Sequence, residues 1–367
     1  MLLIRNVLSV KSLSLPLFKR HIYLFLGLSV LFLILGFSAC SSKLLPPNTE
    51  PLAAIPGELR IGFQVIPNAE LLAKAQGLVK KKFPETKVKW ISYKSGRLVN
   101  QAMAANDIDL GLCGSVPTAM GIAQGLSYKV YFIHDVIGDN EALVVKQSLG
   151  IKTLADLEDK KIAVPFGSTA HFSLLSALAA EDIESKNLTI VDLQPPEMLA
   201  AWQRGEIDGG FIWHPTLNKM LESGGEISVT AKDLAIDKGI ITADVAIVHD
   251  NFLKQYPKFL EEYISVLDEA IEFYRNKPQQ AAEVIAPELG ISPEESLQGM
   301  NELVWLNSSE QADIRFLGTG KYPGAFAQVL KDSADFMVSQ GAMTFAPELS
   351  NYRQAIFNQA VSQASNL

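Results

Sequence analysis

Four short segments of the chain combine small, hydroxyl and amide residues at points where an apolar run gives way to a helical pattern. Ligands of open α/β sheets bind beyond the carboxyl ends of the strands, where helix N-termini offer free N–H groups and a partial positive charge. Helix capping alone explains any one such segment, whereas four in one chain predict a cage for a tetrahedral anion. The segments are Gln64-Val65-Ile66-Pro67-Asn68, Ser95-Gly96-Arg97, Gly114-Ser115-Val116-Pro117-Thr118 and Phe166-Gly167-Ser168-Thr169-Ala170-His171.

Four single residues allow both a structural and a ligand-binding interpretation. His171 falls in the first turn of an expected helix, where it either packs or hydrogen-bonds an oxyanion. Trp213 ends an apolar run and either packs in the core or stacks on an ammonium group, which the face of an aromatic ring attracts. Asp244 and Glu141 each precede an apolar run, so each carboxylate either caps a turn or pairs with a cationic ligand end.

The sequence contains none of the common catalytic or metal-binding motifs. Its five histidines form no His-x-x-x-His pair and no Cys-His zinc spacing, and the chain has neither a Walker loop nor a Gly-x-Ser-x-Gly elbow. Asp107, Asp109, Glu206 and Asp208 fall at expected helix-to-strand turns, which favours turn acids over a catalytic pair. We therefore expect a protein with no catalytic residue, no metal and no cofactor.

Composition and charge indicate a globular protein that does not bind nucleic acid. Hydrophobic residues make up 48% of the 367 residues and charged residues 20%, which is typical of a folded chain with room for two domains. The formal net charge is −8, and residues 1–39 contain basic residues but no acid. The remainder is therefore more acidic still and repels nucleic acid, so a bound anion must be held by local donors.

The first 40 residues have the pattern of an export signal. Basic residues precede an uninterrupted apolar run from Ile22 to Phe37, which leads into Ser38-Ala39-Cys40. The run is short for a membrane span, although a permanent N-terminal helix is the alternative. The segment resembles a bacterial lipoprotein signal, which implies that residues 1–39 are removed and that Cys40 carries lipid. Residues 40–56 are polar and Pro-rich and read as a tether to the membrane.

Strand-like and helix-like segments alternate twice along the chain. Such alternation predicts two helix-covered, mostly parallel sheets. Residues 103–118 and 202–216 repeat one order of features: a helix end, an Asn or Gly stop, an Ile-Asp pair, a strand and then Pro-Thr. Two similar lobes are the preferred interpretation of this echo, the alternative being that such units look alike in any α/β protein. The expected strands are 59–65, 88–93, 108–113, 128–133, 141–146, 161–164, 188–192 and 209–213, with helices over 68–82, 97–105, 117–124, 170–180 and 196–204 and an almost wholly helical part after residue 250.

Three stretches carry a resemblance to a known family. Residues 138–146 (GDNEALVVK), 161–175 (KIAVPFGSTAHFSLL) and 193–209 (LQPPEMLAAWQRGEIDG) are similar to the taurine-binding proteins of ABC importers. The resemblance implies a type II periplasmic-binding-protein fold, with lobe one formed by residues 57–138 and 249–367 and lobe two by 139–248. It also implies hinge closure on a solute, an ABC permease with its ATPase as partner, a monomer, and an exported protein that is membrane-anchored or periplasmic.

The resemblance also assigns site residues. It places Asp244 on the ammonium group of taurine, with Glu141 as a weaker candidate, and Trp213 on a matching tryptophan. Departures at Lys94, Val116 and Ala246, where the family has an acid, a serine and a tryptophan, leave another aliphatic sulfonate or small anion as the alternative solute. An enzyme resembling thiamine-pyrimidine synthases is a remote alternative. The ligand-facing loops would contribute Gln64, Ser95, Gly96, Ser115, Thr118, Ser168, Thr169 and His171.

Overall fold

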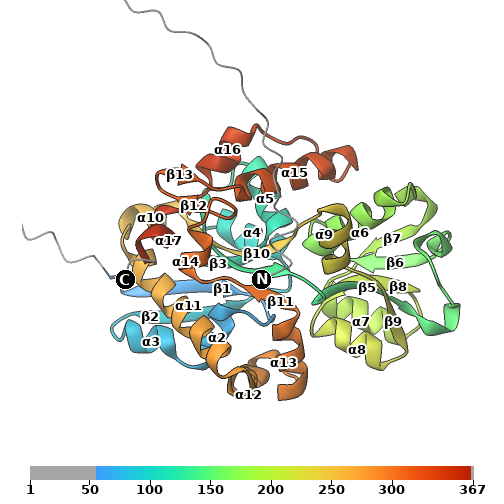
Figure 1. The fold of residues 1–367 in the computed structure, drawn as a ribbon, viewed down its shortest axis with the longest axis horizontal. Helices are drawn as coiled ribbons and strands as arrows, with labels where there is room; N and C mark the ends of the chain where they lie inside the picture. The colour runs from blue at the N-terminus through green and yellow to red at the C-terminus, as the bar shows by residue number, and fades with distance from the viewer. Residues whose placement is uncertain (1–54, 365–367) are drawn as a thin grey trace, which may run out of the picture. The chain divides into compact units, whose positions relative to one another are not determined.

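The computed structural model describes residues 55–364. The expected signal segment, Cys40 and nearly all of the tether lie outside the described residues. Within the described part, the strands form two larger sheets and one short hairpin, with helices packed around the sheets (Figure 1). No helix between residues 55 and 364 is long and apolar enough to cross a membrane.

The first sheet has six strands and mixed direction. In spatial order they are β11 (Leu303–Trp305), β4 (Tyr128–Ile137), β10 (Ala243–His249), β3 (Leu110–Gly114), β1 (Glu58–Phe63) and β2 (Lys87–Ser92). β1 runs parallel to β2 and β3, whereas β10 runs antiparallel to β3 and β4, and β11 antiparallel to β4. The expectation of a mostly parallel sheet is therefore wrong for this sheet, where three of the five strand pairings are antiparallel, because a strand from late in the chain inserts at its centre.

The second sheet has five strands and is also mixed. In spatial order they are β7 (Thr189–Asp192), β6 (Lys161–Val164), β8 (Gly209–Trp213), β5 (Glu141–Lys146) and β9 (Gly225–Thr230). β6 runs parallel to β7 and β8, whereas β5 runs antiparallel to β8 and β9. The expected bounds of β5, β6 and β8 are confirmed to the residue. β9 has exposed side chains at its centre and was not expected from the sequence.

The expected boundary at residue 248 needs correction. It assigns 243–248 to the second lobe, but β10 pairs with β3 and β4 of the first sheet. The backbone therefore connects the two sheets twice, between Ile137 and Glu141 and again between Lys238 and Ala243. Asp244 is consequently a residue of the first sheet that lies next to the second connection.

Helices cover both sheets, and those of the second sheet form the smaller set. The helices that follow strands of the second sheet are α6 (Thr169–Ala180), α7 (Pro195–Gln203), α8 (Thr216–Glu222) and α9 (Ala231–Lys238). The others are α2 (Ala69–Ala75), α3 (Leu78–Lys82), α4 (Gly96–Ala104), α5 (Ser115–Ala123), α10 (Asp250–Gln255), α11 (Phe259–Asn276), α12 (Pro278–Leu289), α13 (Pro293–Asn301), α14 (Ser308–Gln311), α15 (Phe326–Ser339), α16 (Leu349–Gln354) and α17 (Gln359–Ala364).

Two local features differ from the expected helices. The single helix expected over 68–82 is two helices, because Gly77 adopts a left-handed backbone with φ of 66° between α2 and α3. Between residues 250 and 364 the chain is largely helical, as predicted, apart from β11, the hairpin of β12 (Gly318–Thr319) and β13 (Tyr322–Pro323), and a single bridge from Ile356 to Val130.

The internal echo in the sequence corresponds to two copies of one turn. Asn106 and Gly205 end their helices in the left-handed conformation, with φ of 56° and 74°. Three residues later, the carboxylates of Asp109 and Asp208 each accept the N–H of a residue in the adjacent parallel strand, Arg60 and Lys161, both at 2.8 Å. The Ile-Asp acids are therefore turn acids that fix β1 to β3 and β6 to β8.

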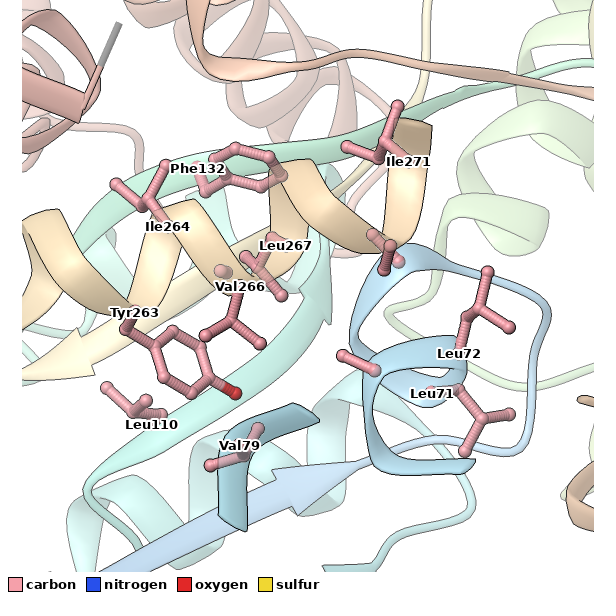
Figure 2. Close-up of a cluster of buried hydrophobic side chains, with 14 of the residues drawn as sticks. Leu71, Leu72, Val79, Leu110, Phe132, Tyr263, Ile264, Val266, Leu267 and Ile271 are labelled. Carbon is pink, nitrogen blue, oxygen red and sulfur yellow. The ribbon is translucent and has the colours of Figure 1, made fainter. Parts of the chain in front are cut away.

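The largest part of the core lies under α11. Tyr263, Ile264, Leu267 and Ile271 recur at helical spacing, are fully buried, and meet Leu71 and Leu72 of α2 (Figure 2). Burying each such side chain contributes roughly 1.5–3 kcal/mol of stability. A Leu267→Ala substitution would cost about 2–5 kcal/mol, because it removes the side chain and leaves a cavity.

Candidate functional site

A small cavity lies where the carboxyl ends of parallel strands from the two sheets face each other. Its open volume is about 20 Å³, which is room for about one water molecule. A solute with several heavy atoms therefore enters only when the sheets move apart. The lining residues are Gln64, Ile66, Gly96, Gly114, Pro117, Ile137, Asn140, Glu141, Ser168, Thr169, Trp213 and Asp244.

Three helices begin at this cavity. Gly96 is the first residue of α4, Gly114 is the N-cap of α5, and Thr169 is the first residue of α6. The first turns of a helix leave N–H groups without intrahelical partners and carry a partial positive charge. The helices come from both sheets, so their N-termini together offer backbone donors to an anion at one place.

Glu141 is a buried acid at the start of β5. Its Oε2 accepts the Thr169 hydroxyl at 2.6 Å and its Oε1 the Ser173 hydroxyl at 3.2 Å. Burial raises the pKa of Glu141 to about 8, the charge of Asp244 adds to this rise, and the two hydroxyls oppose it. No basic side chain of the described residues offsets the charge of this carboxylate.

Asp244 faces the same cavity from the first sheet. It is 8% exposed, and it pairs in register with Gly114 on one side and Asp135 on the other. Burial raises the pKa of Asp244 to about 7. Within residues 55–364, no lysine, arginine or histidine forms an ion pair with Asp244 or Glu141. The cavity thus combines helix N-termini with acids that lack a positive partner.

Seven of the residues expected to bind ligand line the small cavity, and four do not. Gln64 is held by a hydrogen bond from its Nε2 to the Leu112 carbonyl at 3.2 Å. Trp213 ends β8 in register with Glu141 and packs against the core of the second sheet. The seven are Gln64, Gly96, Glu141, Ser168, Thr169, Trp213 and Asp244; the four are Ser95, Ser115, Thr118 and His171.

Ser95, Ser115 and Thr118 lie just behind the lining. Ser95 is 1% exposed, and its hydroxyl makes no hydrogen bond. Ser115 is fully buried, and its Oγ accepts the N–H of Ala243 at 3.3 Å, which ties α5 to β10. Thr118 is fully buried beside the thiol of Cys113. A ligand reaches these hydroxyls only if α4 and α5 shift.

His171 belongs to a second, larger cavity. This cavity has a volume of about 870 Å³, and His171 stacks there on Phe166 with ring centroids 4.6 Å apart. The His171 Nδ1 accepts the N–H of Gly167 at 3.2 Å, and burial lowers its pKa to about 4. A neutral imidazole that lines the larger cavity and not the small one does not fit the expected contact with an oxyanion in the small cavity.

Two hydroxyls expected to face the ligand have protein partners. The Ser168 Oγ donates to the Pro165 carbonyl at 2.6 Å and accepts the His171 N–H at 3.1 Å, so Ser168 caps α6. The Thr169 hydroxyl donates to Glu141 at 2.6 Å. Both residues therefore offer a ligand mainly the oxygen lone pairs and backbone N–H groups around them.

Sequence reasoning missed two polar residues at this site. Asn140 lines the cavity, and its Nδ2 is a buried donor without a hydrogen-bond partner. Asp135 is fully buried next to Asp244 in the sheet. An acid within the apolar run of β4 is the signal that would have identified Asp135.

The described residues offer little for a metal or a nucleophile. They contain no group of three or more His, Cys, Asp and Glu side chains that could hold a metal ion. Cys113 is buried in β3 without a disulfide partner, and burial raises the pKa of its thiol to about 12. At neutral pH the sulfur is a thiol rather than the reactive thiolate.

The chain is similar to known proteins along most of its length. The profile of the NMT1/THI5-like family matches residues 72–281. The "Taurine-binding periplasmic protein" of Escherichia coli (strain K12) is 31% identical over 306 residues, which span 82% of this chain and 92% of that protein. A "Putative aliphatic sulfonates-binding protein" of the same strain is 28% identical over 236 residues, or 64% of this chain and 73% of that one.

A solved structure shares the fold. The alkanesulfonate-binding protein of Xanthomonas axonopodis pv. citri, bound to MOPS, superposes with a TM-score of 0.69 at 23% identity. The match covers 83% of this chain and 99% of that one. The two-lobed α/β periplasmic-binding-protein fold expected from the sequence is thereby confirmed.

Proposed function

Because the chain belongs to the NMT1/THI5-like family, we propose that it is the solute-binding component of an ABC importer for small sulfonates, with taurine as its solute. The observation that carries this proposal is the bipolar small cavity. Its helix N-termini suit an anion with three oxygens, and its unpaired acids suit an ammonium group. Taurine carries both groups on a two-carbon linker.

The cavity residues divide into two groups of roles. The sulfonate lies at the N-termini of α4, α5 and α6, where Gly96, Gly114 and Thr169 let backbone N–H groups approach and Asn140 adds a side-chain donor. The ammonium lies against Asp244, with Glu141 beside it and the face of Trp213 as an apolar wall. Because the described residues place no basic side chain beside these acids, the acids are available to the ligand.

Binding requires a closing motion about the two connections between the sheets. Residues 57–138 with 243–364 would move as one lobe and 139–242 as the other, with the solute between them. Contacts across the cavity form only when the lobes are together, so a solute that touches both shifts the equilibrium toward closure. The closed form is then the one that docks on the permease, and a monomer suffices for this role.

An unsubstituted aliphatic sulfonate is the second candidate solute. Ala246 replaces the family's tryptophan, which removes bulk near Asp244, and one relative is named for aliphatic sulfonates. Against this candidate, a ligand without a positive end leaves the buried acids Asp244 and Glu141 with no cationic partner, which is costly for a charged carboxylate. Taurine is therefore preferred.

An enzyme on this fold is the least supported alternative. Cys113 is a buried thiol, and the relatives that match this chain over most of its length are named as binding proteins. Incubation of the protein with taurine and ethanesulfonate, followed by mass spectrometry of the solutes, tests this alternative. Any turnover product would replace the binding role with catalysis.

Calorimetric titration of the purified chain with taurine, ethanesulfonate, sulfate and nitrate tests the proposed function. We expect saturable 1:1 binding of taurine, weaker binding of ethanesulfonate and none of nitrate. Tighter binding of ethanesulfonate than of taurine would favour the second candidate, and no binding of either sulfonate would refute the proposal.

We also propose that the chain is exported and anchored through a lipid on Cys40. The support is the sequence pattern of residues 1–40 and the periplasmic location named for a relative. Mass spectrometry of the N-terminal peptide from bacterially produced protein should show a diacylglyceryl group on Cys40 and none in Cys40→Ser. An unmodified Cys40 with residues 1–39 still attached contradicts the proposal.

A further inference from the structure

Strand β4 carries a buried acid that makes no hydrogen bond within residues 55–364. Asp135 is fully buried, and neither of its carboxylate oxygens makes a hydrogen bond. Burying a carboxyl group without a hydrogen-bond partner costs free energy, so such groups are rare in folded proteins and call for a specific reason. Neither the resemblance to the family nor the capping pattern gave Asp135 a role.

The strand register places Asp135 on the side of the sheet that faces the small cavity. Asp135 is the direct cross-strand partner of Asp244, and directly paired residues project to the same side of a sheet. Ile137, two residues further along β4, shares that side as well. Asp244 and Ile137 both line the cavity, so Asp135 projects to the same side of the sheet beside Asp244, although it does not line the cavity itself.

The groups around this pair supply no positive charge. On β3, Gly114 has no side chain and the Cys113 thiol has a pKa raised to about 12 by burial. His134 is next to Asp135 on β4, and burial lowers its pKa to about 3, so its imidazole is neutral. On β11 the register partner of Asp135 is the uncharged Trp305.

The two acids of the pair and Glu141 of the second sheet add negative charge or none. Burial and then the charge of Asp244 raise the pKa of Asp135 well above its ordinary value. Glu141 of the second sheet experiences the charge of Asp244 in the same sense. Burial and the charge of Asp244 therefore both make the Asp135 carboxyl harder to ionise while no cation is present.

We propose that Asp135 is the inner acid of the ammonium site, a specificity-determining residue that together with Asp244 selects solutes bearing a positively charged end. This inference rests on the proposed function, because the same cavity holds the ligand. When the ammonium group arrives against Asp244, the Asp135 carboxyl gives its proton to bulk water, and the ligand keeps its own three N–H protons. Two carboxylates then share one cation.

The test compares the wild-type protein with Asp135→Asn and Asp135→Ser by calorimetry at pH 7.5. Each is titrated with taurine and with ethanesulfonate, in two buffers of different ionisation enthalpy that report proton release. We expect both substitutions to weaken taurine about 10-fold, the effect of losing one charged partner, while ethanesulfonate binds unchanged or more tightly. Proton release on taurine binding should fall in both variants.

Thermal unfolding without ligand separates this role from a structural one. Removing an unpartnered buried acid should raise the melting temperature, so the substitutions should gain stability while they lose taurine selectivity. Asp109→Asn is the matched control, because Asp109 is a buried acid paired with Arg60, and its loss should lower the melting temperature and leave the selectivity unchanged.

The outcomes are distinct from those of the proposed function. An unchanged ratio of taurine to ethanesulfonate affinity in both Asp135 variants would overturn the inference while the sulfonate function stands. If the wild-type protein binds neither sulfonate but binds β-alanine, and Asp135→Asn weakens β-alanine, then the sulfonate function falls and the inference stands. If no ammonium-bearing solute binds, both fall.

Discussion

Buried acids occur at both ends of the parallel strands, and the protein surrounds the acids at the two ends with different partners. At the amino end, Asp109 receives both the Nε and the Nη2 of Arg60, at 3.1 and 2.6 Å, together with a backbone N–H. At the carboxyl end of the parallel strands, Asp244 and Asp135 have no basic partner among the described residues. Glu141 accepts hydrogen bonds from two hydroxyls but also has no basic partner there. The fold itself gives Asp109 a positively charged partner, whereas the other three acids would gain one only from a bound ligand.

The contrast distinguishes acids that stabilise the fold from acids that are candidates for binding a ligand. Asp109 and its counterpart Asp208 repeat one turn in both sheets, so their role follows from the fold. The acids at the cavity do not repeat, and they reduce stability in the absence of a cation. A residue that costs stability and lines a cavity is a candidate for function.

The largest expected effect comes from Asp244→Asn. Removing the outer carboxylate should weaken taurine roughly 100-fold, because truncating one partner of a buried charge pair costs several kcal/mol. Ethanesulfonate should lose far less. Asp109→Asn is the control at the other end of the sheet, where we expect unchanged affinity and a loss of about 1–3 kcal/mol in the free energy of unfolding. Titration calorimetry and urea denaturation measure the two quantities, and equal losses for both sulfonates would contradict the role of Asp244.

Gly114→Ala should weaken both sulfonates by a similar factor, roughly 30-fold. A Cβ on Gly114 would lie 2.9 Å from the Thr169 Cγ2 at the start of α6. The resulting overpacking should raise the free energy of the closed arrangement by about 1–3 kcal/mol. The substitution disturbs closure without touching either acid. Gly57→Ala is the control, because a Cβ there meets nothing within 4 Å. Small-angle X-ray scattering should show a more open ensemble for Gly114→Ala, and a selective loss of taurine alone would show that closure is not the cause.

Changing the pH should move stability and taurine affinity in opposite directions. The pKa values of Asp244 and Glu141 rise on folding, from 3.8 to about 7 and from 4.5 to about 8. At pH values between the unfolded and the folded pKa of each acid, the folded state therefore binds more protons than the unfolded state. Stability is then full only below the ordinary pKa values of 3.8 and 4.5, falls as pH rises from there to 7 to 8 and levels off above, whereas taurine binding gains roughly 10-fold from pH 6 to 8 as Asp244 ionises. Urea denaturation and calorimetry at both pH values test this, and the double variant Asp244→Asn/Glu141→Gln should flatten the stability curve.

The smallest effect is expected from His171→Ala. His171 stacks on Phe166 in the larger cavity and is neutral, so its loss should change taurine affinity by less than about threefold. Calorimetry with taurine measures this directly. A loss as large as that of Asp244→Asn would restore His171 to the ligand and place the binding site in the larger cavity.

The sequence predicted the elements better than their arrangement. The bounds of β5, β6 and β8 could be read from apolar runs between turn residues, and Asn106 and Gly205 marked helix ends through their tolerance of the left-handed conformation. The central place of β10 could not be read, because pairing between strands more than a hundred residues apart leaves no local pattern. The mixed direction of both sheets follows from such long-range pairings.

The site was predictable in its position but only partly in its chemistry. Glycines and hydroxyls at strand ends located the cavity, and seven of the expected residues line it. Which hydroxyls have protein partners depends on side-chain geometry, as Ser168 and Thr169 show. The side of the sheet to which Asp135 projects could not be predicted from the sequence. The register of β4 against β10 shifts at a β-bulge between Asp244 and Val245, so simple alternation of sides along β4 fails there.

The first connection between the sheets packs closely against the C-terminal end of α13. A Cβ on Gly138 would lie 2.3 Å from the carbonyl oxygen of Glu302, and the carboxylate of the same Glu302 contacts the His214 Nε2 at 2.8 Å. Glu302 of the first lobe therefore packs against the connection at Gly138 and also contacts His214 of the second lobe. Rotation of the second sheet must lengthen the contact with His214 while the backbone at Gly138 stays in place. A spectroscopic label near Glu302 would thus report solute capture from a position that no solute reaches.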